Sequence, residues 1–575
     1  MTRQIKFLLP LLLIMVAMSC KKFLDINTDP NNPTTIEVSK LLPTTQRTLG
    51  DALSMDEQNG GLSEILAVYT HQMTTREEAD KYGITGVDVN IQTVWSKLFS
   101  STANPGTSFP LYGVLQNLED IIAKSTEADN LKYAGIGKIL KAYTYSILVD
   151  VFGDVPFSEA NKLKEGVLYP KFDDDAEIYP QLFTLLDNAI EDLNNTSAAN
   201  SKVPGTDDLI YGGNISRWIK AANTIKLKMY TQIRKVSNVS SEVNALISSG
   251  NLISSTSESF LIPYGPNSST DDRNPGFYTY FATQRSNHVS PWFYEILKGY
   301  STRVFNGNPD PRLKYYIYNQ ITPTQAPREG NQTEYRDGAF VSIYFGSVGP
   351  DRDRSQQNTI SLFGIYPVGG KYDDGSATIA TANSGTGATP YRLITYADRL
   401  YLEAELIKEG VVTGDARAKL SQAMTESFKQ VDYVITTFVK PTQSVPTLAG
   451  TAAVTTYINN VLAEYDAASS EKKLEIIMTQ KWLSSVGSSV DQYTDIRRTG
   501  YPVVFDPSSP AMAPGGFVQP PINGDPVNPG NQKPVPVQLS RTFALSLPWF
   551  QTDLESNPNS PDQKNPSTYK IFWMP

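Results

Sequence analysis

The alternation of apolar and polar residues predicts helices over much of the first half of the chain. From Leu131 to Val151 the apolar residues recur three and four positions apart on one face, the spacing of an amphipathic helix. We expect this helix to end at Gly153, because glycine commonly stops a helix, and Pro156 follows it. Similar spacing predicts further helices over 62–69, 94–99, 111–123, 178–193 and 215–236.

A second helical region begins at Tyr391. Apolar positions from Tyr391 to Ile407 share one face, and Asp415–Val431 follows a glycine-containing turn to complete a helical hairpin. Residues 457–465 and 471–486 predict another pair. Repeated hairpins of this size predict an all-α fold, in which helical hairpins stack into a superhelix like that of tetratricopeptide repeats (TPR-like).

Between the helical regions the pattern changes to long, irregular loops. Residues 260–345 hold 18 aromatic residues in 86 positions, about 21%, against 10% for the whole chain. Binding residues are often found on loops that a rigid scaffold positions, so we expect these insertions to form the ligand face. The last part of the chain, with 15 prolines from Gly500 to Pro575, is predicted to wrap around the helical body.

The N-terminus has the anatomy of an export signal. Arg3 and Lys6 precede a twelve-residue apolar run, and Cys20, the only cysteine of the chain, stands where cleavage is expected. This arrangement resembles the lipobox of a bacterial lipoprotein, in which the cysteine is lipidated. An ordinary signal peptide followed by an unpaired thiol is the alternative. The predicted organisation is a signal peptide over 1–19, a lipidated tether over 20–40 and one body over 41–575, which comprises a helical scaffold at 41–253 and 391–500, the aromatic-rich loops at 254–390 and the C-terminal wrap at 501–575.

Composition and charge argue against several classes of function. The net charge of −9 does not suit nucleic acid, which attracts a basic surface. The chain has two histidines, His71 and His288, and lacks a Gly-x-Ser-x-Gly elbow, a Walker A loop and a complete dinucleotide loop. Most catalytic classes are therefore unsupported, and we expect no cofactor. A glycosidase needs only two carboxylates and stays open as an alternative among 59 acidic residues.

Five passages, taken in order, form a recognisable series. They are CKKFLDINTDPNNP at 20–33, KILKAY at 138–143 leading to DVFGDVP at 150–156, YRLITYADRLYLEAE at 391–405, IIMTQKW at 476–482 leading to DIRRTGYP at 495–502, and LPWFQ at 547–551 with NPN at 557–559. The series resembles the SusD/RagB family of nutrient-binding outer-membrane lipoproteins of Bacteroidota, and the resemblance covers the whole chain. Asp398 departs from the family pattern where a glutamate is usual, as do Trp549 and Phe550 where Tyr-Pro is usual.

The resemblance implies an all-α body of four TPR-like hairpins with ligand-binding loops inserted on one side. It also implies a partner, a SusC-like TonB-dependent transporter barrel in the outer membrane, over which the lipoprotein acts as a lid. The protein is then expected to be no enzyme, and to capture an oligosaccharide, or in some members a peptide, outside the cell for import. A purely structural or adhesive surface protein is a further alternative.

Aromatic rings flanked by polar groups are the side chains that sugars need, because a ring stacks on a sugar face while amide, carboxylate and guanidinium groups bind hydroxyls. Two loops offer this mixture, 74–95 and 271–300. The candidate ligand-binding residues are Arg76, Tyr82, Asp88 and Asn90 in the first loop, and Asp271, Arg273, Tyr278, Tyr280, Trp292 and Tyr294 in the second. Trp292 is the foremost candidate because it follows a Ser-Pro turn, although residues 291–297 could instead begin a helix that buries it.

The family-like motifs themselves are interpreted as structural. Trp482 lies at helical spacing from Met478 and is expected in the core, as is Trp95. Arg497 and Arg498 are expected to pair with carboxylates or to cap helix ends.

Two acidic groups have structural interpretations as well. Glu403 and Glu405 are expected on a solvated helix face, with Glu403 paired to Arg399 one turn away. Asp351-Arg-Asp-Arg-Ser355 begins like a calcium loop but lacks its glycine and final glutamate, so it is interpreted as a surface turn and no metal is expected.

Overall fold

The computed structural model describes residues 36–575, apart from 57–59, 77–80, 100–112, 284, 326–330, 353–356, 507–508, 511–512 and 519–533. The expected signal peptide, Cys20 and most of the expected tether lie outside the described residues, as do the last three residues of the 351–355 segment and the start of the helix predicted from residue 111.

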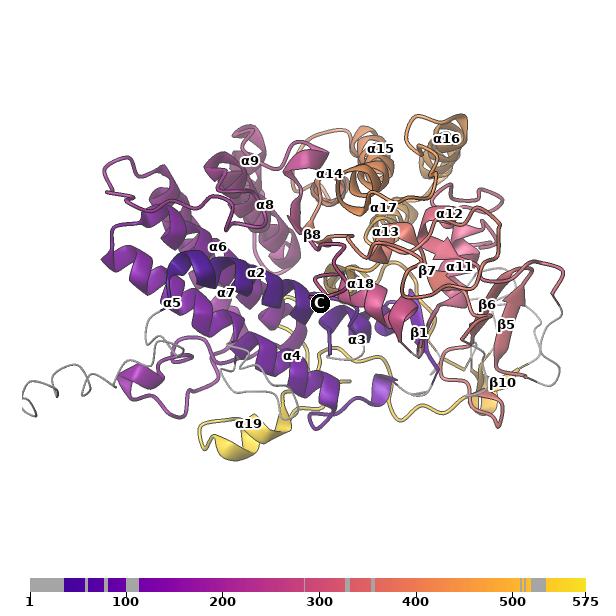
Figure 1. Cartoon of the computed structure of the whole chain (residues 1–575), viewed down its shortest axis with the longest axis horizontal. Coiled ribbons are helices and arrows are strands. Elements are labelled where there is room, and N and C mark those ends of the chain that lie inside the picture. Colours follow the sequence, from indigo (N-terminus) through magenta and orange to yellow (C-terminus); the bar gives the residue numbers. More distant parts are fainter. Residues whose placement is uncertain are drawn as a thin grey trace, which may run out of the picture.

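Helices dominate the described part of the chain (Figure 1). They are α2 (Val38–Leu53), α3 (Leu62–Tyr69), α4 (Val89–Phe99), α5 (Val114–Glu127), α6 (Leu131–Phe152), α7 (Asp175–Asn194), α8 (Ile215–Ile233), α9 (Ser240–Ser248), α10 (Pro275–Phe277), α11 (Pro291–Leu297), α12 (Leu313–Tyr316), α13 (Ile365–Val368), α14 (Tyr396–Lys408), α15 (Ala416–Val434), α16 (Ala452–Ala467), α17 (Ser470–Ser484), α18 (Ser489–Thr499) and α19 (Gln551–Ser556).

The strands are short and pair in twos, so the described residues form no extended sheet. They are β1 (Met73–Thr75), β2 (Phe260–Ile262), β3 (Asn287–Val289), β4 (Ile317–Tyr318), β5 (Glu334–Asp337), β6 (Phe340–Ile343), β7 (Leu362–Phe363), β8 (Tyr391–Ile394), β9 (Phe517–Val518) and β10 (Val535–Pro536). All the pairs are antiparallel: β1 with β3, β2 with β8, β4 with β7, β5 with β6, and β9 with β10.

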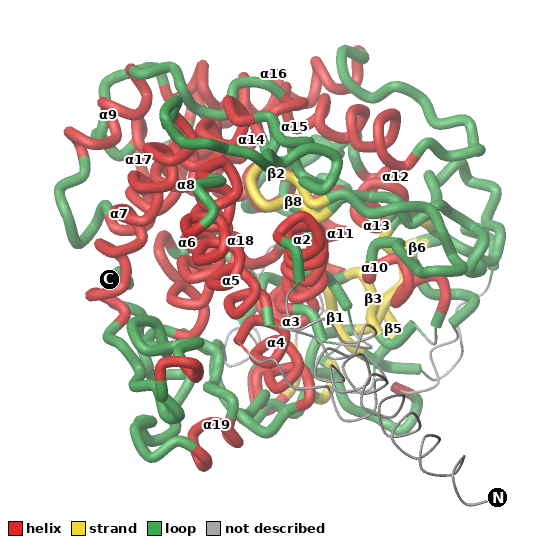
Figure 2. The backbone as a smooth tube through the Cα atoms, turned by 60° about the vertical axis from the view of Figure 1, so that its left-hand side comes forward, coloured by secondary structure: helices red, strands yellow, loops and turns green. Residues whose placement is uncertain are grey.

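Consecutive helices pack in pairs to form a TPR-like scaffold, as predicted. The pairs are α6 with α7, α8 with α9, α14 with α15, and α16 with α17. Neighbouring pairs touch through α7 and α8 and through α15 and α16, and α14 packs on α8 although residues 234–395 separate them in sequence. Figure 1 shows α8, α14, α15 and α16 following one another along one side of the molecule, and Figure 2 shows the strands grouped beside the helices.

The predicted helix at 131–151 is confirmed as α6, which ends at Phe152. Gly153 follows with φ +74°, and a Cβ there would lie 2.5 Å from the ring of Tyr569. Glycine is therefore required both for the left-handed backbone and for the close approach of the C-terminal segment.

The prediction that a helix begins at Tyr391 is wrong, because a short strand precedes the helix. Residues 391–394 form strand β8, and helix α14 begins only at Tyr396. Thr395 caps this helix through a capping box: its hydroxyl accepts the N–H of Asp398, and the Asp398 carboxylate accepts the N–H of Thr395 at 2.8 Å. This reciprocal cap fixes the first residue of the helix and leaves the preceding residues extended.

Strand β8 closes the long insertion between the scaffold halves. It pairs with β2, which lies just after α9, so the chain leaves the scaffold and returns to it at adjacent positions. Within the insertion, α10–α13 and β3–β7 form a compact unit on the right of Figure 1.

The interpretation of Glu403 and Glu405 as a solvated face is wrong, because the two side chains are buried. Glu403 pairs with Arg399, as predicted, and its other oxygen lies 2.5 Å from Lys419. Glu405 pairs with Arg498, and also with Arg234 at 2.8 Å. Apolar spacing alone gave no sign of Arg234 and Arg498, which come from distant parts of the chain.

The structural interpretation of the other motif residues is confirmed. Trp482 and Trp95 are buried, and the indole N–H of Trp482 donates to the Thr70 carbonyl at 3.0 Å. Arg498 pairs with carboxylates as expected, whereas Arg497 donates to backbone carbonyls, among them Asp150 at 2.6 Å. Two of the carbonyl groups that Arg497 binds lie at the C-terminal end of α6 and in the segment before α19.

The C-terminal segment packs along α6. The N–H of Leu547 donates to the Val151 carbonyl at 2.9 Å, and the indole N–H of Trp573 donates to the buried Asp150 carboxylate at 3.0 Å.

Among the described helices, none has the length and apolarity to cross a membrane.

Candidate functional site

The two loops predicted to bind ligand are brought together by a strand pair. Strand β1 from the first loop runs antiparallel to β3 from the second, with Thr74 opposite His288. The N–H of Arg76 extends this pairing by donating to the Ser286 carbonyl at 2.7 Å. Two segments about 200 residues apart in sequence thus form one continuous region of the fold.

The structure buries Trp292, the foremost candidate. The residue lies in α11, its side chain is 2% exposed, and its ring stacks on Phe505 with ring centroids 4.2 Å apart. The edge of His71 contacts the same indole at a centroid distance of 5.9 Å. A ligand could therefore reach this ring only if side chains that cover it, Phe505 among them, moved.

Four other candidates are also buried, and each is used by the fold. Tyr82 accepts or donates a hydrogen bond with His71 at 2.9 Å, and Tyr280 packs edge-on against Phe363. The candidates with less than a tenth of their surface exposed are Trp292, Tyr280, Tyr294, Tyr82 and Arg76. His71 is itself buried, and this burial lowers its pKa to about 3, because desolvation disfavours its charged form.

Most of the remaining candidates reach the surface, whereas the side chain of Arg273 is only 8% exposed. Tyr278 is 36% exposed at the start of a π-helical turn, Tyr278–Ala282. Beside it in sequence, Asp271 accepts the Nε–H of Arg273 at 2.7 Å, and the guanidinium lies over the Phe277 ring. In the other loop, the half-buried Asp88 accepts the N–H of Asn90 at 2.9 Å and so caps α4.

An exposed aromatic group that sequence reasoning did not select lies at the end of α11. Tyr300 is 38% exposed, and its hydroxyl donates to Asp337 Oδ2 at 3.0 Å. The hydroxyl of the buried Tyr294 donates to the same oxygen at 2.8 Å, and Lys298 Nζ lies 5.5 Å from the centre of the Tyr300 ring. We call Tyr294, Lys298, Tyr300 and Asp337 the Tyr300 patch.

The Tyr300 patch is rigid at its base. Tyr294 stacks on Phe340 with ring centroids 3.7 Å apart and an interplanar angle of 5°. Asp337 and Phe340 pair across the β5–β6 hairpin, so the carboxylate has a fixed position under the tyrosine. Burial and the bond to Asp337 raise the pKa of Tyr300, which therefore stays neutral at physiological pH. A neutral ring beside a carboxylate and an ammonium group suits a hydroxyl-rich ligand.

Comparison with known proteins identifies the family. The model of the SusD-like family described as "Starch-binding associating with outer membrane" matches residues 30–519. The chain belongs to this SusD-like family. A search of curated proteins found no match.

Solved structures show the same fold. A chitin-binding protein matches with 23% identity and a TM-score of 0.61, over 84% of this chain and 91% of its own. A SusD homologue from Bacteroides fragilis matches with 18% identity and a TM-score of 0.60, over 90% and 94%. A SusD-like protein from Bacteroides thetaiotaomicron matches with 20% identity and a TM-score of 0.60, over 91% of this chain and 93% of its own.

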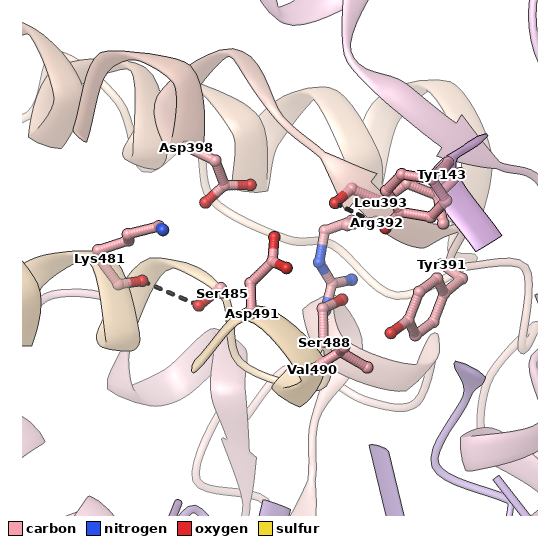
Figure 3. Close-up of a pocket in the computed structure, with 10 residues that line it drawn as sticks. All are labelled: Tyr143, Tyr391, Arg392, Leu393, Asp398, Lys481, Ser485, Ser488, Val490 and Asp491. Atoms are coloured by element: carbon pink, nitrogen blue, oxygen red, sulfur yellow. Dashed lines mark hydrogen bonds between the residues drawn. The ribbon is translucent and has the colours of Figure 1, made fainter. Parts of the chain in front are cut away.

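In this SusD-like chain, three of the family-resembling motifs meet around a small internal chamber. Its lining residues are Tyr143, Tyr391, Arg392, Leu393, Asp398, Lys481, Ser485, Ser488, Val490 and Asp491. Figure 3 shows Asp398, Lys481 and Asp491 converging from three sides. The chamber has a volume of about 10 Å³, which is room for about one water molecule.

The charges around this chamber serve the SusD-like scaffold. Lys481 lies 2.8 Å from Asp495, and Lys228 lies 3.0 Å from Asp491. The pKa of Asp398 is raised above its ordinary value, because the effect of burial exceeds the opposing effect of the charge of Lys481. The chamber is far too small for a sugar, so the residues of these motifs join helices rather than bind nutrient.

One acidic cluster could hold a cation on distance alone. Oxygens of Asp154, Asp174 and Asp175 lie within 4.8 Å of one another. Each is used by the fold: Asp174 caps α7, Asp154 accepts the N–H of Asp175 at 2.9 Å, and Asp175 accepts the N–H of Phe572 at 3.0 Å. These bonds account for the cluster without a metal ion.

Proposed function

We propose that this SusD-like protein binds a neutral oligosaccharide through the Tyr300 patch. The observation that carries the proposal is an exposed ring held against a carboxylate on a rigid support. A sugar ring can stack on Tyr300, while Asp337 and Lys298 bind hydroxyls at its edge. The chitin-binding protein of similar fold and the starch-binding description of the family support a glycan as ligand.

The exposed members of the predicted set are proposed to extend this binding face. Tyr278, with Asp271 and Arg273 near it in sequence, combines a ring with charged groups, and Asp88 with Asn90 adds a carboxylate and an amide. The buried candidates are proposed to support the face from below: Tyr294 positions Asp337, and Arg76 continues the β1–β3 pairing that joins the two loops.

Replacing Tyr300 by alanine is expected to weaken oligosaccharide binding about 5- to 30-fold, since a lost stacking contact costs about 1–2 kcal/mol. Tyr300→Phe retains the ring and is expected to lose less. Calorimetric titration with chito- and malto-oligosaccharides measures both. Tyr169→Ala is the matched control, because Tyr169 is 48% exposed but lies in the loop before α7.

Unchanged affinity in Tyr300→Ala would remove the patch from the binding site. Recovery of the oligosaccharide intact after incubation would agree with a binding role. Its cleavage would instead favour the surface glycosidase that the sequence leaves open.

We further propose that the protein is lipidated at Cys20, faces the cell exterior and delivers its ligand to a SusC-like TonB-dependent transporter. Several acyl chains, at ~0.8 kcal/mol per buried CH₂, would hold it permanently on the outer membrane. The family's association with that membrane supports this location.

The Cys20→Ser variant is expected to move from the outer-membrane fraction to the soluble fraction, because it cannot be acylated. Immunoblots of fractionated cells measure the shift, and mass spectrometry of the tagged parent protein, isolated in mild detergent, tests for a co-purifying transporter. Membrane retention of the variant would show that another contact anchors the protein. Isolation without any barrel protein would count against delivery to a transporter.

A further inference from the structure

A surface pocket lies where the loop after Tyr300 meets helix α16. It adjoins the Tyr300 patch, since the N–H of Gly307 donates to the Gly299 carbonyl at 2.8 Å, but it has a lining of its own. Loop 302–308 and helix α16 enclose a surface pocket with a volume of about 360 Å³. Small-molecule sites in proteins span ~300–1,000 Å³, so this pocket has room for a small ligand. None of the ten predicted ligand-binding residues lines it, and neither does Tyr300.

The loop that forms one wall is held in a strained conformation. Phe305 has φ +57°, which is rare for a large side chain, and its ring is buried. The N–H of Phe305 donates to Glu464 Oε2 at 2.9 Å, and its carbonyl accepts the N–H of Asn308 at 3.0 Å. The Ser301 hydroxyl accepts the N–H groups of Arg303 and Val304. Strain of this kind persists only where the surroundings hold it, so the wall is preformed.

Amide groups provide the binding chemistry. Asn460 and Glu464 are one turn apart on the same face of α16. The Asn460 amide donates to Asn308 Oδ1 at 3.1 Å, which leaves its own Oδ1 as an acceptor, and Asn308 in turn donates to the Tyr457 carbonyl. Asn306 is exposed in the loop and adds a further donor and acceptor. Such paired donors and acceptors match hydroxyl and amide groups.

The cation at the pocket is already neutralised. Arg303 makes two bonds to Glu475, at 2.5 and 3.1 Å, and Lys472 lies 3.0 Å from the same carboxylate. Burial raises the pKa of Glu464. A phosphate or carboxylate ligand would therefore find no free positive charge among the described lining residues, and Glu464 would repel it.

We propose that this pocket binds one or two units of a neutral saccharide, independently of the Tyr300 patch. Asn460, Asn306 and Glu464 bind its hydroxyl or acetamido groups, and the strained loop shapes the wall around it. The site would give the scaffold a second point of contact with a long glycan.

Hydrogen exchange of the intact protein, followed by mass spectrometry, locates the site directly. D-glucose and N-acetyl-D-glucosamine are the probes, and glucose 6-phosphate is the charged comparison. Either neutral probe is expected to protect segments 301–308 and 457–465. In Asn460→Ala, the probe concentration needed for half-maximal protection is expected to rise roughly three- to tenfold, which is the effect of losing one hydrogen bond. Asn459→Ala, the exposed neighbour outside the lining, is the matched control and is expected to behave as the parent.

The remaining outcomes would overturn the proposal. Protection confined to 294–300 and 334–340 would assign saccharide binding to the Tyr300 patch alone. Stronger protection by glucose 6-phosphate would contradict a neutral ligand, and equal protection in Asn460→Ala and the parent would remove α16 from the site. Protection of the pocket segments with none at the Tyr300 patch would support this site while contradicting the function proposed for the patch. Absence of protection everywhere would contradict both.

Discussion

Replacing Glu405 by alanine is expected to destabilise the protein by about 3–5 kcal/mol, because it removes the buried carboxylate that two buried cations share. Glu405 and Arg498 have no exposed side-chain surface, and Arg234 has 2%. Burial alone raises the pKa of Glu405, but the charges of Arg234 and Arg498 outweigh this effect and lower the pKa to about 2. The ionised form is therefore built into the native state.

Chemical denaturation followed by circular dichroism measures the loss of stability. Glu409→Ala is the matched control: Glu409 lies one turn further along, 3.7 Å from the same Arg234, but is 25% exposed. An ion pair at the surface contributes up to about 1 kcal/mol, so this variant is expected to change little. If the two substitutions lowered the free energy of unfolding equally, the burial of Glu405 would not make its ion pairs more important for stability than that of Glu409.

The low pKa of Glu405 also predicts how its contribution to stability changes in acid. Since the folded-state pKa of about 2 lies below the ordinary 4.5, the contribution of Glu405 is complete above pH 4.5 and is lost as pH falls toward 2. It amounts to about 3 kcal/mol at neutral pH, at 1.36 kcal/mol per pKa unit. The stability difference between parent and Glu405→Gln should therefore shrink across this range, and a constant difference would contradict the assigned charge state.

Replacing Trp292 by alanine is expected to cost about 3–5 kcal/mol of stability, because it leaves a cavity among packed rings. Its indole contacts Phe505 and His71, which come from segments far from α11. The loss should appear as a lower unfolding midpoint without ligand. Any loss of glycan affinity is expected to follow from partial unfolding, and to disappear at a temperature where the variant is fully folded.

Tyr278→Ala provides the comparison for Trp292→Ala. Tyr278 is 36% exposed, so its removal should change stability by less than about 1 kcal/mol. If Trp292→Ala kept parental stability yet lost glycan binding, Trp292 would contact ligand through an opened form in which Phe505 has moved. That result would restore the original interpretation of the residue.

Apolar periodicity predicted most long helices because it reports which face is buried. Helices α6, α7 and α8 begin or end within a few residues of their predicted bounds, and their cores follow the predicted spacing. The error at 391–394 arose because an apolar run before a helix has the same pattern whether it is helical or extended. Only the pairing with β2, about 130 residues earlier, decides between the two.

The ligand-binding residues were harder to predict, because an aromatic-rich loop says nothing about which rings reach the surface. Trp292 and Tyr294 lie two positions apart on α11, and both are buried, whereas Tyr300 just beyond the helix is not. Asp337 joins Tyr294 and Tyr300 from a hairpin that carries no motif. One signal was present: Gly299, with φ +71°, ends the turn after α11 and so places Tyr300 beyond the helix.

The pairing of β2 with β8 has a consequence for how the ligand specificity of this protein can change. The two strands hold the two ends of the insertion together, so the anchoring of these ends does not depend on the length of chain between them. Lengthening such a loop adds only ~0.6 kcal/mol of closure entropy for each doubling. Exposed loops of the insertion, the part proposed to recognise the nutrient, can therefore be lengthened or shortened at little cost where contacts such as the β1–β3 pairing are kept.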